Sequence, residues 1–146
     1  MKLTIGTAVA ALMISACDPR PDAIRYGEDK CAHCLMTIVD PRFGCEMVTE
    51  KGKIYKFDAV ECMVSYLNKP DNNPVPAAHL LTNTHDKPEQ LTDVLDCVFL
   101  ISLELPSPMG MYINPFHSEV KAIETQKRHG GTIYSWDELS DVIQPF

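Results

Sequence analysis

A repeated strand-and-helix pattern constrains the fold of this chain more than any other feature of its sequence. One copy reads Gly52-Lys-Ile-Tyr-Lys-Phe-Asp58 and the other reads Gly131-Thr-Ile-Tyr-Ser-Trp-Asp137. Alternating apolar residues predict a strand, and Asp58 and Asp137 are placed to cap the helices that follow. A chance match between two common units is the alternative. Duplication predicts an α+β fold with two similar lobes that face each other.

Within the first lobe, residues 43–49 and 53–57 predict the two strands of a hairpin, followed by a helix at residues 59–67. In the second lobe, residues 98–101 form the apolar centre of a strand. A helix is expected to begin after Ser118 and to end near residue 129, before a glycine pair. Val120 and Ile123 are predicted to face the core from this helix.

Composition and pattern together divide the chain into five segments. Residues 1–16 are expected to be a lipoprotein signal peptide and residues 17–29 a polar tether. Residues 30–69 form the first lobe and residues 91–146 the second. Residues 70–90 are rich in proline and asparagine and are expected to be an irregular connection between the lobes.

The first residues of the chain resemble an export signal that ends in a lipobox. Lys2 precedes an apolar run that is too short to span a bilayer, and Leu12-Met-Ile-Ser-Ala-Cys17 follows. Cleavage before Cys17 would leave its sulfur to carry the lipid. An ordinary signal peptide cut near Ala16 is the alternative. The lipobox predicts a cell-envelope protein, lipid-anchored to a membrane and facing the periplasm or the exterior.

Charge and cysteine count argue against two classes of protein. The formal net charge of −7 disfavours nucleic acid as a partner, because an acidic surface repels phosphate. Without Cys17, an odd number of cysteines remains, so they cannot all pair within the chain. A closed disulfide scaffold is therefore excluded. The remaining cysteines are Cys31, Cys34, Cys45, Cys62 and Cys97.

Soft metal ligands are concentrated in Cys31-Ala-His-Cys34-Leu-Met36. Thiolates and thioethers together favour Cu(I), whereas Zn(II) seldom takes a thioether. In an extended segment, Cys34 and Met36 would point to one side and Leu35 into the core. Met109, in the Pro- and Gly-bounded loop of the second lobe, is the natural partner for this pair. The alternative is a buried Cys and a core Met.

Three other interpretations compete with a copper site. Cys31 and Cys34 form a CxxC pair that suits a thiol–disulfide protein, although β-branched residues follow where a helix usually begins. A structural zinc site would need four ligands, and Cys31, His33, Cys34 and Cys62 could be recruited. A lipoprotein without any metal role is the third.

Met47 and Cys97 fit core packing, and His117 is either a fourth ligand or a polar residue before the helix.

Taken together, these features resemble the NosL family, the lipoprotein accessory proteins of nitrous-oxide reductase. The resemblance covers nearly the whole chain after the signal peptide, although Leu35 stands where many members have Gly. The matching features are Cys17, Cys34-Leu-Met36, residues 52–57 with Asp58 and Cys62, Pro108-Met109-Gly110, Phe116, and Gly130-Gly131 with Asp137.

The resemblance implies two ββα-type lobes and a function in copper handling. A NosL-like protein would not be an enzyme but a metallochaperone that binds Cu(I) for denitrification. It would pass copper to an ABC-type maturation complex or another assembly partner of the copper enzyme. Cys34, Met36 and Met109 occupy the copper-ligand positions of the family. Cys31 is shared only with members that carry a CxxC pair.

Overall fold

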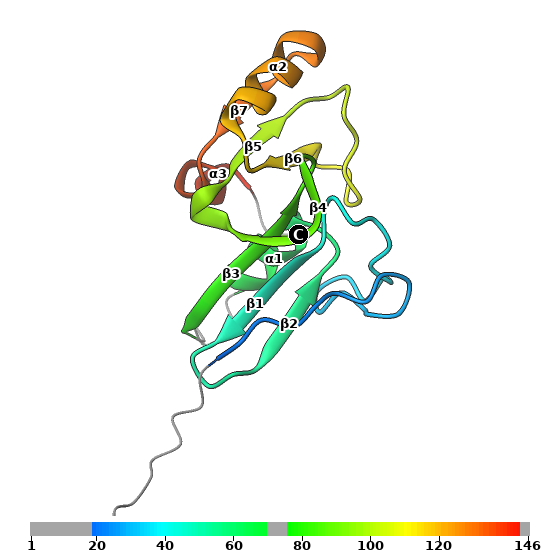
Figure 1. Cartoon of the computed structure of the whole chain (residues 1–146), viewed down its shortest axis with the longest axis vertical. Helices are drawn as coiled ribbons and strands as arrows, with labels where there is room; N and C mark the ends of the chain where they lie inside the picture. The colour runs from blue at the N-terminus through cyan, green and yellow to red at the C-terminus, as the bar shows by residue number, and fades with distance from the viewer. Residues whose placement is uncertain (1–18, 70–75, 144–146) are drawn as a thin grey trace, which may run out of the picture.

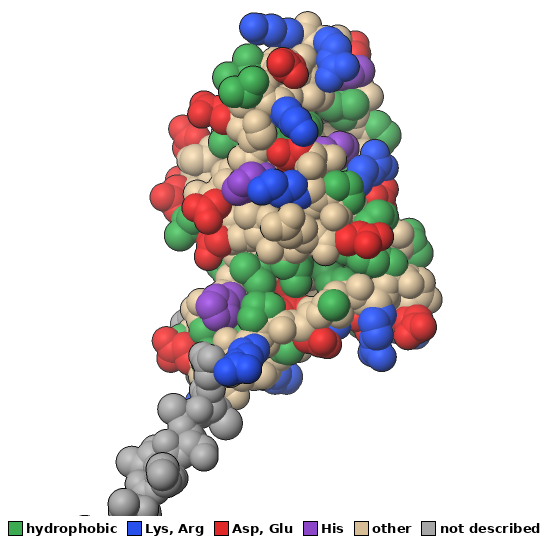
Figure 2. Space-filling view, viewed as in Figure 1, with side chains coloured by type: hydrophobic (Ala, Val, Ile, Leu, Met, Phe, Trp, Pro, Cys, Tyr) green, Lys and Arg blue, Asp and Glu red, His purple; other side chains and the backbone are tan. Residues whose placement is uncertain are grey.

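The computed structural model describes residues 19–69 and 76–143 (Figure 1). The expected signal peptide and the lipidation site Cys17 lie outside these residues. No helix in the described ranges is both long and apolar enough to cross a membrane. Acidic and basic side chains are mixed over the face that Figure 2 shows, so neither sign of charge forms one continuous patch there.

The first sheet has four antiparallel strands in the order β2-β1-β3-β4. Strands β1 (Cys45–Thr49) and β2 (Ile54–Phe57) form the predicted hairpin, with Met47 opposite Tyr55. Helix α1 (Val60–Leu67) follows β2 and packs against both strands. Its apolar residues Val60, Met63 and Val64 are buried, as their spacing predicted.

Part of the segment predicted as an irregular connection is instead regular sheet. Strand β3 (Ala77–Thr84) pairs with β1, and β4 (Lys87–Asp93) pairs with β3. The prolines misled the prediction. Pro76 precedes β3, and Pro88 lies in the edge strand β4, where a missing N–H can face away from the ladder.

The second sheet has three antiparallel strands in the order β6-β5-β7. A single turn of 3₁₀ helix, η1 (Val94–Asp96), leads into the strands. Helix α2 packs against all three strands, and α3 contacts β5 and β7. The elements are β5 (Val98–Ile101), β6 (Ile113–Phe116), α2 (Glu119–His129), β7 (Thr132–Tyr134) and α3 (Trp136–Val142). Two small sheets with helices confirm the predicted α+β class.

Both copies of the repeat form a strand followed by a helix, β2 with α1 and β7 with α3, but neither aspartate caps its helix. Helix α1 begins after Ala59 without a side-chain cap. Helix α3 begins after Ser135, which forms a capping box with Glu138. The predicted capping roles of Asp58 and Asp137 are therefore wrong. In α3, Ser135 at the N-cap provides the acceptor two residues before Asp137.

Helix α2 has the predicted ends but not the predicted buried face. Ser118 accepts the N–H of Lys121 at its start, and Gly130 ends it. Val120 and Ile123 are exposed, whereas Ala122 is fully buried. The small Ala side chain lets the helix approach the sheet closely. Gly131 shows the same crowding, because a Cβ there would lie 2.2 Å from the carbonyl oxygen of Ile101.

One hydrophobic core continues through both lobes. Buried residues from the first sheet and α1 join others from β5, β6 and α3 in one cluster. His85, in the β3–β4 turn, packs between the rings of Phe43 and Phe116, and its N–H donates to Pro115. The lobes are therefore joined by packed side chains rather than by a flexible linker.

Candidate metal centre

The segment with the soft ligands is a closed loop rather than an extended strand. The N–H of Cys31 donates to the carbonyl of Met36 at 2.8 Å, and Leu35 N–H donates to Cys31 at 3.0 Å. Leu35 has a positive φ of 65° and is 72% exposed. The predictions of a strand and of a core position for Leu35 are therefore wrong. Side-chain alternation fails here because residues 32–34 turn.

Three thiols converge where this loop meets α1. The Sγ atoms of Cys31, Cys34 and Cys62 lie within 4.8 Å of one another. The N–H of Ala32 donates to the carbonyl of Lys56 and thereby fixes the loop beside β2. Cys31 and Cys62 are fully buried, and Cys34 is half-buried. Such a group could hold a metal ion.

The surroundings of Cys31 favour a negatively charged sulfur. The Cys62 thiol is directed at it, and the pKa of Cys31 falls to about 5 despite burial. Backbone N–H groups of Cys34, Asp58 and His33 add to this effect, two of them at 3.5 and 3.4 Å from the sulfur. The hydrogen bond to Cys31 raises the pKa of Cys62, and burial raises that of Cys34. Without metal, the cluster therefore holds one thiolate between two thiols.

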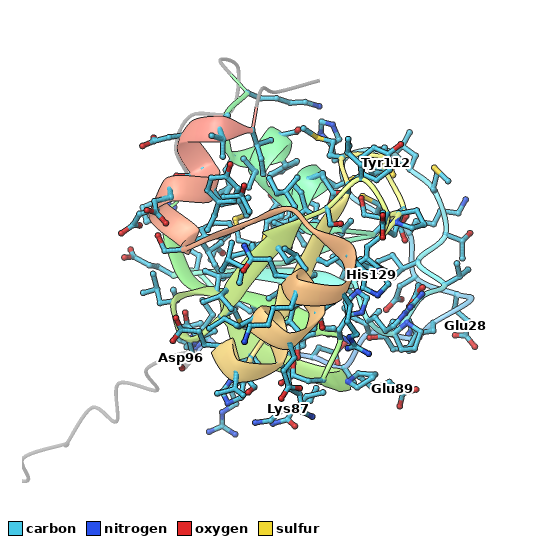
Figure 3. All side chains as sticks on the ribbon, turned by 90° about the horizontal axis from the view of Figure 1, so that it is seen from above. Glu28, Lys87, Glu89, Asp96, Tyr112 and His129 are labelled. Carbon is cyan, nitrogen blue, oxygen red and sulfur yellow. The ribbon has the colours of Figure 1, made fainter. Side chains whose placement is uncertain are left out.

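Met36 lies at the surface beside this cluster. Its side chain is 54% exposed and lines a hollow of about 410 Å³. Pro106, Ser107 and Pro108 from the second lobe line the same hollow. Figure 1 shows the β5–β6 loop extending toward residues 30–42. In Figure 3, Tyr112 and Glu28 lie on the same side of the molecule, opposite Asp96. The loop that carries Met109 therefore lies near the first-lobe motif, and both line the hollow.

Buried Glu61 connects the Met109 loop to α1. The hydroxyl of Ser107 donates to Oε1 of Glu61, and the N–H of Met111 also stabilises its charged form. Burial nevertheless raises the pKa of this carboxyl. A turn closed by Gly110 N–H and the Ser107 carbonyl holds Met109. Met109 and Met111 are both half-buried and pack against the same core as Cys34.

Asp58 forms part of the boundary between the thiols and the hollow. Asp58 is almost fully buried, and it also lines the hollow beside Met36. Its Oδ1 has no hydrogen-bond partner. Burial and the neighbouring charge of Cys31 raise the pKa of Asp58 to about 6.

The structure brings together two of the four predicted metal ligands, Cys31 and Cys34, and places Met36 at the adjacent hollow. It adds Cys62, which sequence analysis had considered only for a zinc site. Buried Met47 and Cys97 confirm the prediction of core packing. His117 donates its N–H to Asp86 and is not among the residues that line the hollow. All five cysteines in the described ranges are free.

A comparison with protein families shows that residues 24–143 match the family model NosL. The chain belongs to the NosL family. Among solved structures, it resembles the crystal structure of the copper chaperone NosL from Shewanella denitrificans, with a TM-score of 0.71 and 21% sequence identity. The match covers 83% of this chain and 96% of the other, and it confirms the predicted fold. A search of curated proteins gave no match.

The likeness at this identity shows the fold, and the family match confirms the resemblance seen in the sequence. The solved NosL protein is described as a copper chaperone. This agrees with the expectation of a carrier rather than an enzyme.

Proposed function

We propose that this member of the NosL family is a membrane-anchored Cu(I) metallochaperone. Its recipient would be the maturation machinery of a copper enzyme, and the family resemblance implies that this enzyme is nitrous-oxide reductase. The observation that carries the proposal is the group of thiols within 4.8 Å of one another, next to the exposed thioether of Met36. Sulfur donors of these two kinds suit Cu(I) better than Zn(II) or hard cations.

The proposed ligands are Cys34, Met36 and Met109, with Cys31 as a further thiolate. Cys34 supplies a negative charge that neutralises the cation, whereas the thioethers are neutral and replaceable. Met36 is exposed and lines the hollow, and Cys34, two residues before it, is half-buried. An incoming ligand from the recipient can therefore displace one donor at a time. Transfer would proceed by ligand exchange without a change in the oxidation state of copper.

One observation favours a second function, that of a thiol–disulfide protein. The lowered pKa of Cys31 is typical of a reactive CxxC cysteine. Against it, Cys31-Ala-His-Cys34 forms a turn that leads into irregular structure and does not open a helix. A reversible Cys31–Cys34 disulfide with reductase activity in the absence of copper would favour this alternative.

The metal assignment is tested by competition between the reduced protein and a Cu(I) chelator. We expect one tightly bound Cu(I) per chain, which excess Zn(II) does not displace. Cys97→Ala serves as a control, because this buried thiol lies outside the group of clustered cysteines. Displacement of Cu(I) by Zn(II) from the intact protein would show that the metal assignment is wrong.

Anchoring is tested separately through Cys17, which lies outside the described residues. The lipobox implies that Cys17→Ser abolishes lipidation and releases the protein from membranes. Fractionation of cells, together with the mass of the mature protein, measures both effects. Unchanged mass and membrane association in the variant would contradict the lipid anchor.

A further inference from the structure

Cys62 has a position that the proposed ligand set does not explain. It is fully buried on α1, and its Sγ lies within 4.8 Å of those of Cys31 and Cys34. A core cysteine needs only apolar neighbours, but this one faces two other sulfurs. Cys45 and Cys97 show the ordinary arrangement, since their thiols donate to the backbone carbonyls of Phe43 and Asp93.

We propose, on the basis of the proposed function, that Cys31, Cys34 and Cys62 form an inner position for Cu(I). This trithiolate position lies behind an outer position made by Cys34, Met36 and Met109, and Cys34 belongs to both. The inner position holds the ion away from solvent, and the outer position presents it to the recipient.

The geometry of the three sulfurs suits one ion. Sulfurs that each lie roughly 2.3 Å from a metal in a trigonal plane are roughly 4 Å apart. The observed limit of 4.8 Å therefore requires the group to contract by less than roughly 1 Å on binding. Rotation of the half-buried Cys34 side chain can supply this movement, whereas Cys31 and Cys62 are held by the loop and by α1.

The backbone around the inner position already accommodates negative charge. N–H groups of His33 and Cys34 point at the Cys31 sulfur from within the loop. Hydrogen bonds of this kind stabilise a thiolate without competing for the metal, because they use other lone pairs of the sulfur. Exposure increases from the buried Cys31 and Cys62, through Cys34, to Met36 at the surface. This gradient defines the direction in which copper leaves.

Movement from the inner to the outer position is a ligand exchange. The bonds from copper to Cys31 and Cys62 break, and bonds to the thioether sulfurs of Met36 and Met109 form. Copper remains Cu(I), and the bond to Cys34 is kept throughout. Of the two released sulfurs, Cys62 takes up a proton from water and Cys31 stays a thiolate, as in the cluster without metal, so no oxidant or reductant is required.

The experiment compares Cu(I) binding by Cys62→Ala, by the double variant Met36→Leu with Met109→Leu, and by the control Cys97→Ala. We expect the Cu(I) dissociation constant of Cys62→Ala to rise roughly tenfold or more, and that of the control to stay unchanged. Near-ultraviolet absorption from thiolate to copper should fall by about a third in Cys62→Ala, because one of three thiolates is lost. The double variant should keep this absorption in full.

The outcomes separate this inference from the proposed function. If wild type binds Cu(I) and Cys62→Ala matches it in affinity and absorption, the inner position is wrong and the chaperone proposal stands. If wild type itself binds no Cu(I), the proposed function fails first. Circular dichroism reports whether Cys62→Ala is folded. If Cys62→Ala is unfolded, the double variant Met36→Leu with Met109→Leu provides the test. Loss of the thiolate-to-copper absorption in this double variant would overturn the inner position.

Discussion

The two copies of the strand-and-helix repeat have the same local structure but different chemistry. In the first, α1 carries buried Glu61 and Cys62, which contact the Met109 loop and the thiol cluster. The positions that follow at the same spacing in the second copy are Ser140 and Asp141, and Asp141 is exposed. The comparison teaches that the repeat supplies the scaffold, whereas the metal chemistry belongs to one copy.

The copies also differ in what stabilises the start of each helix. Ser135 in the second copy caps α3 through its hydroxyl. The equivalent residue in the first copy is Lys56, whose Nζ lies 2.8 Å from Asp29 Oδ2. The carbonyl of Lys56 also accepts the N–H of Ala32, next to Cys31. One copy therefore uses this position to begin its helix, and the other uses it to hold the metal-binding loop.

The largest expected effect comes from removing the thiolate shared by both proposed copper positions. We expect Cys34→Ser to weaken Cu(I) binding more than any other single substitution, because it removes the only sulfur that both proposed positions share. Asp141→Ser, in the second copy, should bind like wild type. Chelator competition measures both variants. Equal loss in the two would contradict the claim that only one copy carries the metal chemistry.

The second copy should matter for folding instead. Leu139 of α3 is fully buried, and Leu139→Ala should lower the free energy of unfolding by about 2–5 kcal/mol. Cu(I) stoichiometry of the folded variant should stay at one per chain. Denaturant unfolding and copper titration test the two effects. A stable variant that has lost its copper would reverse the assignment of roles.

The proposed thioether ligands should separate binding from stability. Met36→Leu and Met109→Leu should each weaken Cu(I) binding at the outer position by about 1–3 kcal/mol, as for loss of one buried polar contact. Leu preserves volume, so the free energy of unfolding should change by less than about 1.5 kcal/mol.

Met111→Leu is the matched control for the thioether variants, because Met111 is also half-buried near the end of the same loop. Chelator competition and thermal unfolding are measured for all three. If only Met111→Leu weakens binding, the wrong methionine has been assigned. If none does, the site does not bridge the lobes.

The smallest effect concerns the ion pair that holds the loop in the first copy. Burial opposes ionisation of Asp29, but hydrogen bonds from Lys56 and Arg25 lower its pKa from 3.8 to about 2. Ionised Asp29 therefore stabilises the folded state above about pH 4, and this contribution is lost as the pH falls toward 2. The stability difference between wild type and Asp29→Asn should shrink over this range. A constant difference would show that the ion pair is not responsible.

Sequence patterns predicted the local elements better than the contacts between them. Alternation predicted the β1–β2 hairpin and helical spacing predicted α1, because both are local properties of the sequence. The conformation of residues 31–36 was predicted wrongly. A turn closed by the backbone hydrogen bond from Cys31 to Met36 leaves no periodic pattern in the sequence. Cys62 was considered only for a zinc site, because its contact with Cys31 depends on how the loop packs against α1.

X-ray absorption at the copper edge of the Cu(I)-loaded wild-type protein tests the central claim most directly. All the proposed ligands are sulfur atoms, from Cys31, Cys34 and Cys62 on one side and from Met36 and Met109 on the other. The account predicts a Cu(I) edge and a first shell made of sulfur alone. A shell dominated by nitrogen or oxygen would contradict it.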